Sequence, residues 1–335
     1  MRNQMEKSDY GFMKRLPAAL LICAVFVAVL AALTACSAKP AGQGESEYLQ
    51  EEDVAWVTII DDMGREVRLP RKPERIISLT PSSTEFLFAL GLGEKVVGVS
   101  EYCNYPPEAL AIAKAGDFVQ PNIEQIIALA PDFVISDPLQ REQFSRLEEL
   151  EIPFIALYST SLDDVFAALD LLGRATGAEE EAFLLADEMR RKFAAIEGMI
   201  RNSSETDKKV RVYYEISAVP LMSVGSKTVI HDLIEAAGGE NIFGDLEMTY
   251  PQVSAEAVLE RDPEIIVFPD YHGTEGFLSE EMMQRPGWSD VSAIKSNRLY
   301  GMDADLISRP GPRVAEAAEV LAGLFYPDLF GNDER

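Results

Sequence analysis

An internal repeat constrains the fold of this chain more than any other feature of its sequence. Residues 124–135 (EQIIALAPDFVI) align without gaps on residues 256–267 (EAVLERDPEIIV). In both copies a polar residue two positions before the Glu, Asn122 or Ser254, can cap a short helix, a Pro ends that helix, and an apolar run continues as a strand. The chain is therefore expected to fold as two structurally matched halves.

Each half alternates apolar strands with amphipathic helices, which is the pattern of an α/β domain. In the first half, residues 75–79 predict a buried strand, and Ser82 with Glu85 has the spacing of a helix capping box. In the second half, residues 210–216 predict the corresponding strand, and residues 229–237 predict a helix that two glycines close. The expected fold class is α/β.

A long helical stretch, residues 161–204, lies between the two halves. Its apolar residues recur at helical spacing, as at Val165, Phe166, Leu169, Leu172, Phe183, Leu184, Met189, Phe193 and Ile196. Gly173 and Gly177 are two positions where this helix can be interrupted. A helix of about 30 residues would span about 45 Å, enough to connect two lobes as a stiff strut. We therefore expect lobes at residues 55–160 and 205–330.

The N-terminus predicts export. Basic residues within the first 15 positions precede an uncharged apolar run, residues 16–35, which ends in small residues directly before Cys36. This order is typical of a secretory signal, although roughly 20 apolar residues are also long enough for a transmembrane anchor. Residues 33–36 (LTAC) resemble a bacterial lipobox, which implies cleavage before Cys36 and a lipid on that residue.

The segment after Cys36 predicts a flexible tether. Residues 36–54 are rich in Gly, Ser, Ala and Glu and contain few large apolar side chains. We therefore expect an extracytoplasmic protein, anchored by lipid in the periplasm or at the outer face of the cytoplasmic membrane. Which membrane holds the lipid stays open.

The composition argues against several classes of function. The net charge is −26 and there is no run of Lys or Arg, so a nucleic-acid partner is not expected. Two His and three Cys, with no pair at metal-ligand spacing, predict neither a metal site nor a cofactor. The sequence contains no Gly-x-Ser-x-Gly elbow, no P-loop and no complete dinucleotide fingerprint, so we do not expect an enzyme.

Four passages in order point to a known family: residues 75–85 (RIISLTPSSTE), 122–132 (NIEQIIALAPD), 238–243 (GGENIF) and 251–254 (PQVS). From about Val57 to Tyr326 the chain resembles the substrate-binding proteins of bacterial ABC importers, in the helix-linked group that serves cobalamin, ferric siderophores and haem. The resemblance implies two Rossmann-like lobes joined by one long α-helix, the class III periplasmic binding protein fold, with a ligand cleft between the lobes and little hinge motion. It also implies a monomer.

Two further passages, residues 98–107 and 305–313, are most similar to the cobalamin-binding members. The resemblance then implies a set of cleft-lining residues: Tyr102, Phe118, Met222 and Tyr250 as aromatic or apolar contacts, and Asp305 and Arg309 as polar contacts. Aromatic faces with a few polar groups suit a corrinoid, which is a flat disc with an apolar body and an amide rim.

Other interpretations of these residues stay open. On local sequence alone, a hydrophobic core explains Phe118 and Met222 better than ligand contact does. Tyr102 can also lie in an exposed loop, although its position favours ligand contact. Phe118, Tyr250 and Asp137 stand where the enteric cobalamin-binding member has Trp, and a carboxylate at Asp137 is not an obvious replacement.

The two repeated glutamates predict a docking surface. In this family a Glu on each lobe meets Arg residues of the membrane permease, and Glu124 and Glu256 occupy the matching positions. The alternative is that each carboxylate only complements a helix dipole, which contributes about 0.3 to 1 kcal/mol.

The function expected is thus capture of cobalamin and delivery to an ABC permease dimer with its ATPase. The alternatives are a ferric siderophore or haem as cargo, and, more remotely, an exported sensor or enzyme of similar fold without a permease.

Overall fold

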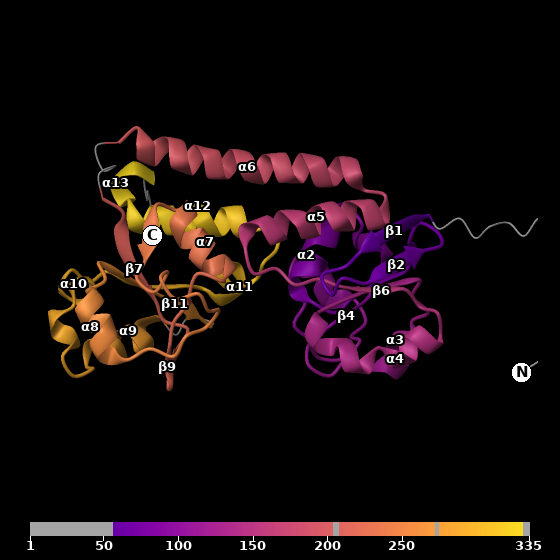
Figure 1. Cartoon of the computed structure of the whole chain (residues 1–335), viewed down its shortest axis with the longest axis horizontal. Coiled ribbons are helices and arrows are strands. Elements are labelled where there is room, and N and C mark those ends of the chain that lie inside the picture. Colours follow the sequence, from indigo (N-terminus) through magenta and orange to yellow (C-terminus); the bar gives the residue numbers. More distant parts are fainter. Residues whose placement is uncertain (1–55, 204–207, 272–274, 331–335) are drawn as a thin grey trace, which may run out of the picture. The chain divides into compact units, whose positions relative to one another are not determined.

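The computed structural model describes residues 56–203, 208–271 and 275–330, although the side chains of residues 141–143 and 275–278 are outside the description (Figure 1). All of these residues belong to one compact unit, residues 53–335. The predicted signal peptide, the lipidation site at Cys36 and the tether lie outside the described residues. Among the helices within the described ranges, none has the length and apolarity needed to cross a bilayer.

The N-terminal lobe is built on a parallel sheet of four strands in the order β4-β3-β5-β6. Its strands are β3 (Ile76–Ser78), β4 (Val96–Val99), β5 (Phe133–Ser136) and β6 (Phe154–Ala156). All side chains of β3 and β5 are buried, as is usual where helices and loops cover both faces of a parallel sheet. An antiparallel hairpin, β1 (Val57–Ile60) and β2 (Glu66–Leu69), precedes this sheet.

The C-terminal lobe repeats the same plan. Its parallel sheet has the order β10-β7-β11-β12, formed by β7 (Val210–Tyr214), β10 (Gly239–Asn241), β11 (Ile265–Asp270) and β12 (Leu299–Asp303). Within each lobe, the strand that comes first in the chain lies between the second and the third. The prediction of two matched α/β lobes is therefore confirmed. A short hairpin, β8 (Ser217–Ala218) and β9 (Leu221–Met222), follows β7.

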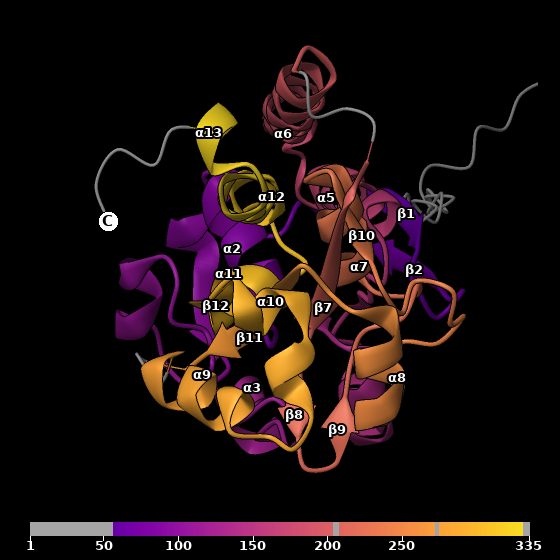
Figure 2. The same cartoon turned by 90° about the vertical axis from the view of Figure 1, so that its left-hand side faces the viewer.

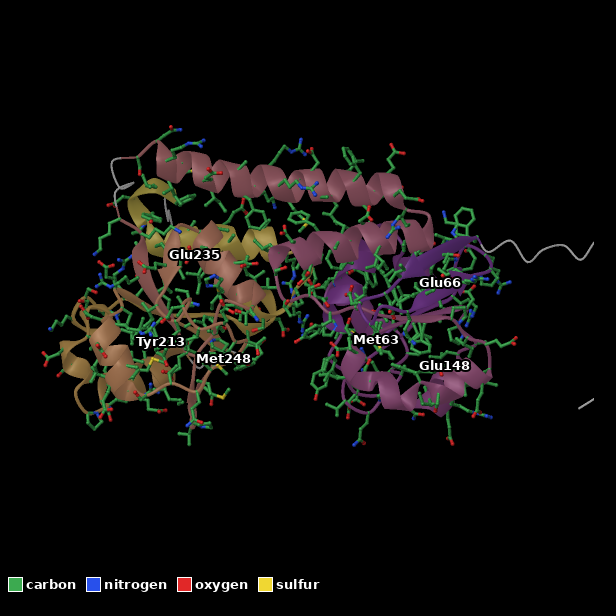
Figure 3. All side chains as sticks on the ribbon, viewed as in Figure 1. Met63, Glu66, Glu148, Tyr213, Glu235 and Met248 are labelled. Atoms are coloured by element: carbon green, nitrogen blue, oxygen red, sulfur yellow. The ribbon has the colours of Figure 1, made fainter. Side chains whose placement is uncertain are left out.

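The remaining elements are helices. In the N-terminal lobe they are α2 (Pro81–Ala89), α3 (Ile123–Ala128) and α4 (Ser145–Glu149), with 3-10 turns η1 (Gly93–Lys95), η2 (Pro107–Ala111) and η3 (Pro138–Gln143). In the C-terminal lobe they are α7 (Val229–Ala236), α8 (Ala255–Arg261), α9 (Glu275–Met283), η4 (Trp288–Asp290), α10 (Ser292–Lys295), α11 (Ala304–Ser308), α12 (Val314–Phe325) and α13 (Pro327–Phe330). Figure 3 shows the side chains that these elements carry, with Glu148 on the N-terminal lobe and Tyr213 on the C-terminal lobe.

The helix caps predicted from the repeat are confirmed. The Asn122 Oδ1 atom accepts a hydrogen bond from the Gln125 N–H at 3.0 Å, and the Ser254 Oγ atom accepts one from the Ala257 N–H at 3.1 Å. These bonds satisfy N–H groups that the first helical turn leaves without a partner. The two helices therefore begin at equivalent places in the two lobes.

The capping box predicted from Ser82 and Glu85 is wrong. Helix α2 begins earlier, with Thr80 as its cap and Pro81 in its first turn, and the Thr80 Oγ1 atom accepts from the Ser83 N–H at 3.3 Å. Proline suits the first turn because it has no N–H to leave unpaired. Glu85 therefore lies inside the helix, where its carboxylate is free for a different role.

The predicted single linking helix is two helices, α5 (Leu162–Thr176) and α6 (Glu179–Arg201). Gly177 has a φ of 67°, a left-handed conformation that glycine adopts without strain and that ends a right-handed helix, whereas Gly173 stays helical. Helix α6 has 23 residues, which corresponds to a length of about 35 Å. It runs beside both α5 and α12 and so connects the N-terminal to the C-terminal lobe (Figures 1 and 2).

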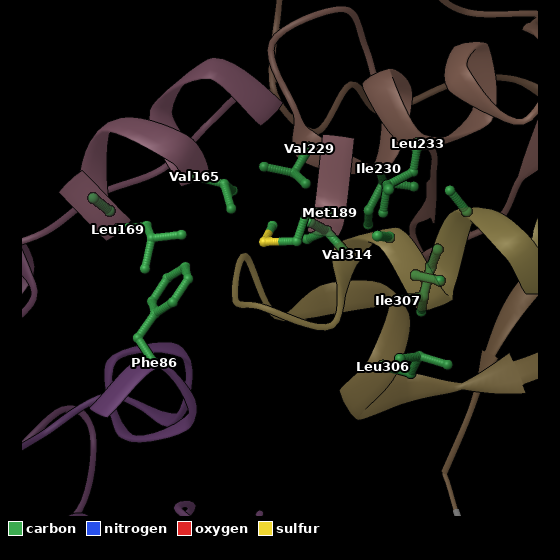
Figure 4. Close-up of a cluster of buried hydrophobic side chains, with 14 of the residues drawn as sticks. Phe86, Val165, Leu169, Met189, Val229, Ile230, Leu233, Leu306, Ile307 and Val314 are labelled. Carbon is green, nitrogen blue, oxygen red and sulfur yellow. The ribbon is translucent and has the colours of Figure 1, made fainter. Parts of the chain in front are cut away.

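One hydrophobic core is shared by both lobes and by α6. It brings together Phe86 on α2, Val165 on α5, Met189 on α6, Val229 on α7 and Val314 on α12 (Figure 4). Separating the lobes would expose part of this core, and exposed apolar surface costs about 25 cal/mol per Å². The continuous core therefore opposes a wide hinge motion.

Candidate functional site

The carboxyl ends of the strands in both sheets face one cavity. In open α/β sheets a ligand binds beyond the carboxyl ends, beside the place where the strand order reverses. That place lies between β3 and β5 in one lobe and between β7 and β11 in the other. The cavity has a volume of about 760 Å³, which suits a small-molecule ligand.

Loops that follow the strands supply the walls of this cavity. From the N-terminal lobe come the start of α2 (80–83), Asp137 and Leu139 after β5, and residues 157–160 after β6. From the C-terminal lobe come the start of α7 (227–230), Thr249 and Tyr250, Tyr271 after β11, and residues 308–310 at the end of α11. Both lobes are thus needed to complete the cavity.

Aromatic side chains form much of the wall. Three come from the N-terminal lobe and two from the C-terminal lobe: Tyr102, Phe118, Tyr158, Tyr250 and Tyr271. The four tyrosines are between 47% and 59% exposed, so their rings are accessible to a ligand. Burial, and then the phenol of Tyr158 from the opposite lobe, raise the pKa of Tyr250. The two lobes therefore present aromatic rings toward a common space.

The structure brings together some of the residues predicted to contact a ligand and not others. Tyr102, Phe118, Tyr250 and Arg309 line the cavity. Met222 and Asp305 do not line the cavity. Met222 is half-buried on β9, and Asp305 lies on α11, where it binds Arg309.

Sequence reasoning missed Tyr158 and Tyr271, which lie two residues after β6 and one residue after β11. An aromatic residue directly after a predicted parallel strand is the signal that would have found both.

Arg309 is engaged by the protein rather than free. Its guanidinium is surrounded by acceptors: Glu85 Oε1 at 3.1 Å, Asn104 Oδ1 at 2.7 Å, Asp305 Oδ2 at 2.7 Å and the Tyr102 carbonyl at 3.3 Å. Asn104 also donates to Asp305 at 2.9 Å. This network fixes the Tyr102 loop against the C-terminal lobe.

Glu85 is the centre of the polar contact between the lobes. It is 2% exposed, and both of its carboxylate oxygens bind Arg313, at 2.8 Å each, while Arg309 binds the same carboxylate. The Arg313 guanidinium also lies 4.0 Å from the ring centre of Tyr105. We call the residues Glu85, Arg309 and Arg313 the interlobe clasp.

Sequence reasoning missed the partner of these arginines because it treated Glu85 as a cap. Glu85 directly precedes the apolar residues Phe86 and Leu87, which are buried. This position could have predicted a cationic partner for Glu85, because a buried charge requires one.

The charges around the cavity are balanced. The clasp and Asp305 contribute two carboxylates and two guanidinium groups that bind one another. Of these groups only Arg309 lines the cavity. The other charged lining residues are Asp137 and Lys227, which come from opposite lobes. The Lys227 ammonium is exposed and makes no ion pair with any residue that the structure describes. The cavity thus carries no excess of either sign among its described side chains.

A second cavity, of about 830 Å³, lies on the other side of the clasp between α2, α6 and α12. It is slightly larger, but helices α2, α6 and α12 supply much of its wall, which does not include the residues directly after the parallel strands. Its described charged residues are mostly glutamates, among them Glu94, Glu108, Glu188 and Glu316. We take the strand-end cavity as the candidate site because the topology of both sheets converges on it.

Glu124 and Glu256 lie in the first turns of α3 and α8, and both are exposed. Figure 1 shows α3 and α8 at the lower edge of the two lobes, on the side away from α6. The two carboxylates are therefore accessible to a partner, one on each lobe.

The sequence is similar to that of solute-binding proteins in each comparison with known proteins. The sequence model of the periplasmic binding protein family matches residues 76–306. The chain is 33% identical over 319 residues to the uncharacterized ABC transporter substrate-binding lipoprotein YvrC of Bacillus subtilis (strain 168), across 93% of this chain and 97% of that protein. It is 31% identical over 252 residues to the vitamin B12-binding protein of Vibrio cholerae, across 75% of this chain and 88% of that protein.

Solved structures agree on the fold and differ in cargo. The periplasmic vitamin B12-binding protein BtuF of Vibrio cholerae matches with a TM-score of 0.64 and 29% identity, over 76% of this chain and 97% of that one. The periplasmic heme-binding protein RhuT from Roseiflexus sp. RS-1 matches with a TM-score of 0.67 and 27% identity, over 76% and 98% of the two chains.

Proposed function

Because this chain belongs to the periplasmic binding protein family, the solute-binding proteins of ABC importers, we propose that it captures a corrinoid outside the cytoplasm and delivers it to an importer permease. Binding and release are the whole of this function. Energy for transport comes from the ATPase of the importer.

The observation that carries the choice of cargo is the charge balance of the aromatic cavity. A ferric catecholate complex is an anion, and its binding calls for a cluster of basic side chains without partners. The cavity offers Lys227, whose ammonium has no ion-pair partner among the described residues, while Arg309 is bound by Glu85 and Asp305. A bulky cargo with an apolar body and a mostly uncharged rim fits these walls better.

The aromatic rings provide contact area for such a cargo. Tyr102, Phe118 and Tyr158 face it from one lobe and Tyr250 and Tyr271 from the other, so that a flat disc is held between two walls. The resemblance assigned Arg309 to a direct polar contact. Its four protein acceptors favour instead a role in holding the Tyr102 loop, and leave Lys227 to contact an anionic group of the cargo.

Delivery rests on the two exposed glutamates. Glu124 and Glu256 offer one carboxylate per lobe to paired cationic sites on a permease dimer, and charges at an interface set its orientation and specificity more than its affinity. The shared core and the clasp keep the separation of these carboxylates nearly constant. A lipid on Cys36 would keep the protein at the membrane that holds the permease.

Haem is the second candidate cargo, because the cavity wall presents tyrosine hydroxyls and a tyrosine can ligate haem iron. Calorimetric titration of the purified full-length protein in detergent with cyanocobalamin, haemin and a ferric catecholate complex separates the candidates. We expect saturable heat with cyanocobalamin at micromolar ligand. Binding of haemin or of the ferric complex with no cyanocobalamin heat would refute the corrinoid assignment.

A further inference from the structure

Asp137 is a buried carboxylate in the wall of the cargo cavity. It directly follows β5, at the place where the strand order of the N-terminal sheet reverses, and it is 9% exposed. Its Oδ1 atom accepts a hydrogen bond from the Leu139 N–H at 2.8 Å. Its Oδ2 atom has no partner among the residues whose side chains the structure describes.

The neighbouring residues hold Asp137 in place without neutralising it. The buried side chain of Gln140 accepts from the Asp137 N–H at 3.1 Å and donates to the Phe118 carbonyl. Burial raises the pKa of Asp137, since the hydrogen bond from Leu139 offsets only part of the lost hydration. The carboxylate is thus fixed near Phe118, with one oxygen that accepts no hydrogen bond from any described side chain.

A carboxylate that is largely withdrawn from water and lacks a protein donor at one oxygen is costly in free energy, and a ligand that supplies a donor there lowers this cost. The cations that line the same cavity do not do so: Arg309 is bound by Glu85 and Asp305, and Lys227 forms no ion pair with a described residue. An ionised carboxylate accepts hydrogen bonds and donates none. The open site therefore suits an N–H group and disfavours a second carboxylate.

We propose that Asp137 makes the cavity select a corrinoid whose rim presents amide N–H groups over one whose rim presents a carboxylate. This inference rests on the proposed function and adds a specificity-determining residue to it. An amide NH2 donates to the open oxygen, whereas a carboxylate at the same place meets a buried like charge, which is the repulsive element that specificity requires.

The test compares two ligands that differ at the rim. Cyanocobalamin and its monocarboxylic acids, in which one propionamide is hydrolysed to a carboxylate, are titrated into the full-length protein at pH 7.5 by calorimetry. The protein as it stands is expected to bind cyanocobalamin at least about tenfold more tightly than the acid whose carboxylate faces Asp137.

Asp137→Asn keeps an oxygen for the Leu139 N–H and removes the charge. We expect the ratio of the two affinities to fall below about threefold, mainly because binding of the acid improves. Asp117→Asn is the matched control. Asp117 accepts from the Val119 N–H in the adjacent loop, the same turn geometry, but does not line the cavity, so its ratio should equal that of the unaltered protein.

The outcomes separate this inference from the proposed function. Equal affinities for cyanocobalamin and for every monocarboxylic acid in the unaltered protein would overturn the role of Asp137 and leave the corrinoid assignment standing. An unchanged ratio in Asp137→Asn would also overturn it. Absence of binding to both ligands would overturn the proposed function itself. The first comparison needs no substitution, so it does not depend on the folding of a variant.

Discussion

The interlobe clasp leads to the most direct prediction about stability. Replacing Glu85 with Ala removes the buried carboxylate from Arg309 and Arg313, whose side chains are 11% and 17% exposed. Breaking a buried pair by removing one partner costs about 3 to 5 kcal/mol. Arg309 keeps Asp305 and Asn104, whereas Arg313 loses both of its hydrogen bonds to a carboxylate. We therefore expect a loss near the lower end, about 3 kcal/mol.

Urea denaturation followed by tryptophan fluorescence measures this loss as a change in the free energy of unfolding. Glu66→Ala is the matched control, because Glu66 binds Arg68 at 2.8 Å while 57% exposed, and exposed pairs contribute below about 1 kcal/mol. A second arm, Arg313→Met in the Glu85→Ala background, removes one stranded charge and should recover part of the lost stability. If Glu85→Ala cost no more than Glu66→Ala, the clasp would not hold the lobes.

Three further predictions concern the cavity and the docking surface. Tyr250→Ala should weaken cyanocobalamin binding about tenfold in calorimetry, because a stacked ring is lost. The control Phe183→Ala, on the exposed face of α6, should leave the affinity unchanged. Equal effects of the two substitutions would show that the aromatic wall does not bind the ligand. Replacing both Glu124 and Glu256 with Ala should abolish corrinoid-dependent growth of the host and leave affinity within about twofold; normal growth would refute docking. Burial raises the pKa of Asp137 in the folded state, so ionisation of this carboxyl group lowers the free energy of unfolding as the pH rises. We therefore expect Asp137→Asn to be more stable than the unaltered protein at pH 7. This advantage should be lost below about pH 3.9, where the carboxyl group is protonated in both states. An advantage that is the same at both pH values in urea denaturation would contradict this.

The sequence by itself determined the architecture of the lobes. Asn122 and Ser254 cap helices at equivalent places, and the apolar runs that follow are central strands of two parallel sheets with the same order. These features depend on capping bonds and apolar periodicity that act within a few residues of one another. They can therefore be predicted from a local stretch of chain.

Tertiary structure alone decided how the cavity is completed. Glu85 has the sequence spacing of a cap, yet it binds arginines more than 200 residues away, at separations of 224 and 228. Arg309, predicted as a polar ligand contact, lines the cavity and is also bound by that carboxylate and by Asp305. Whether a charged side chain meets a ligand or a protein partner depends on which distant loops approach it, and the energy of a buried charge is set by those neighbours rather than by its own segment.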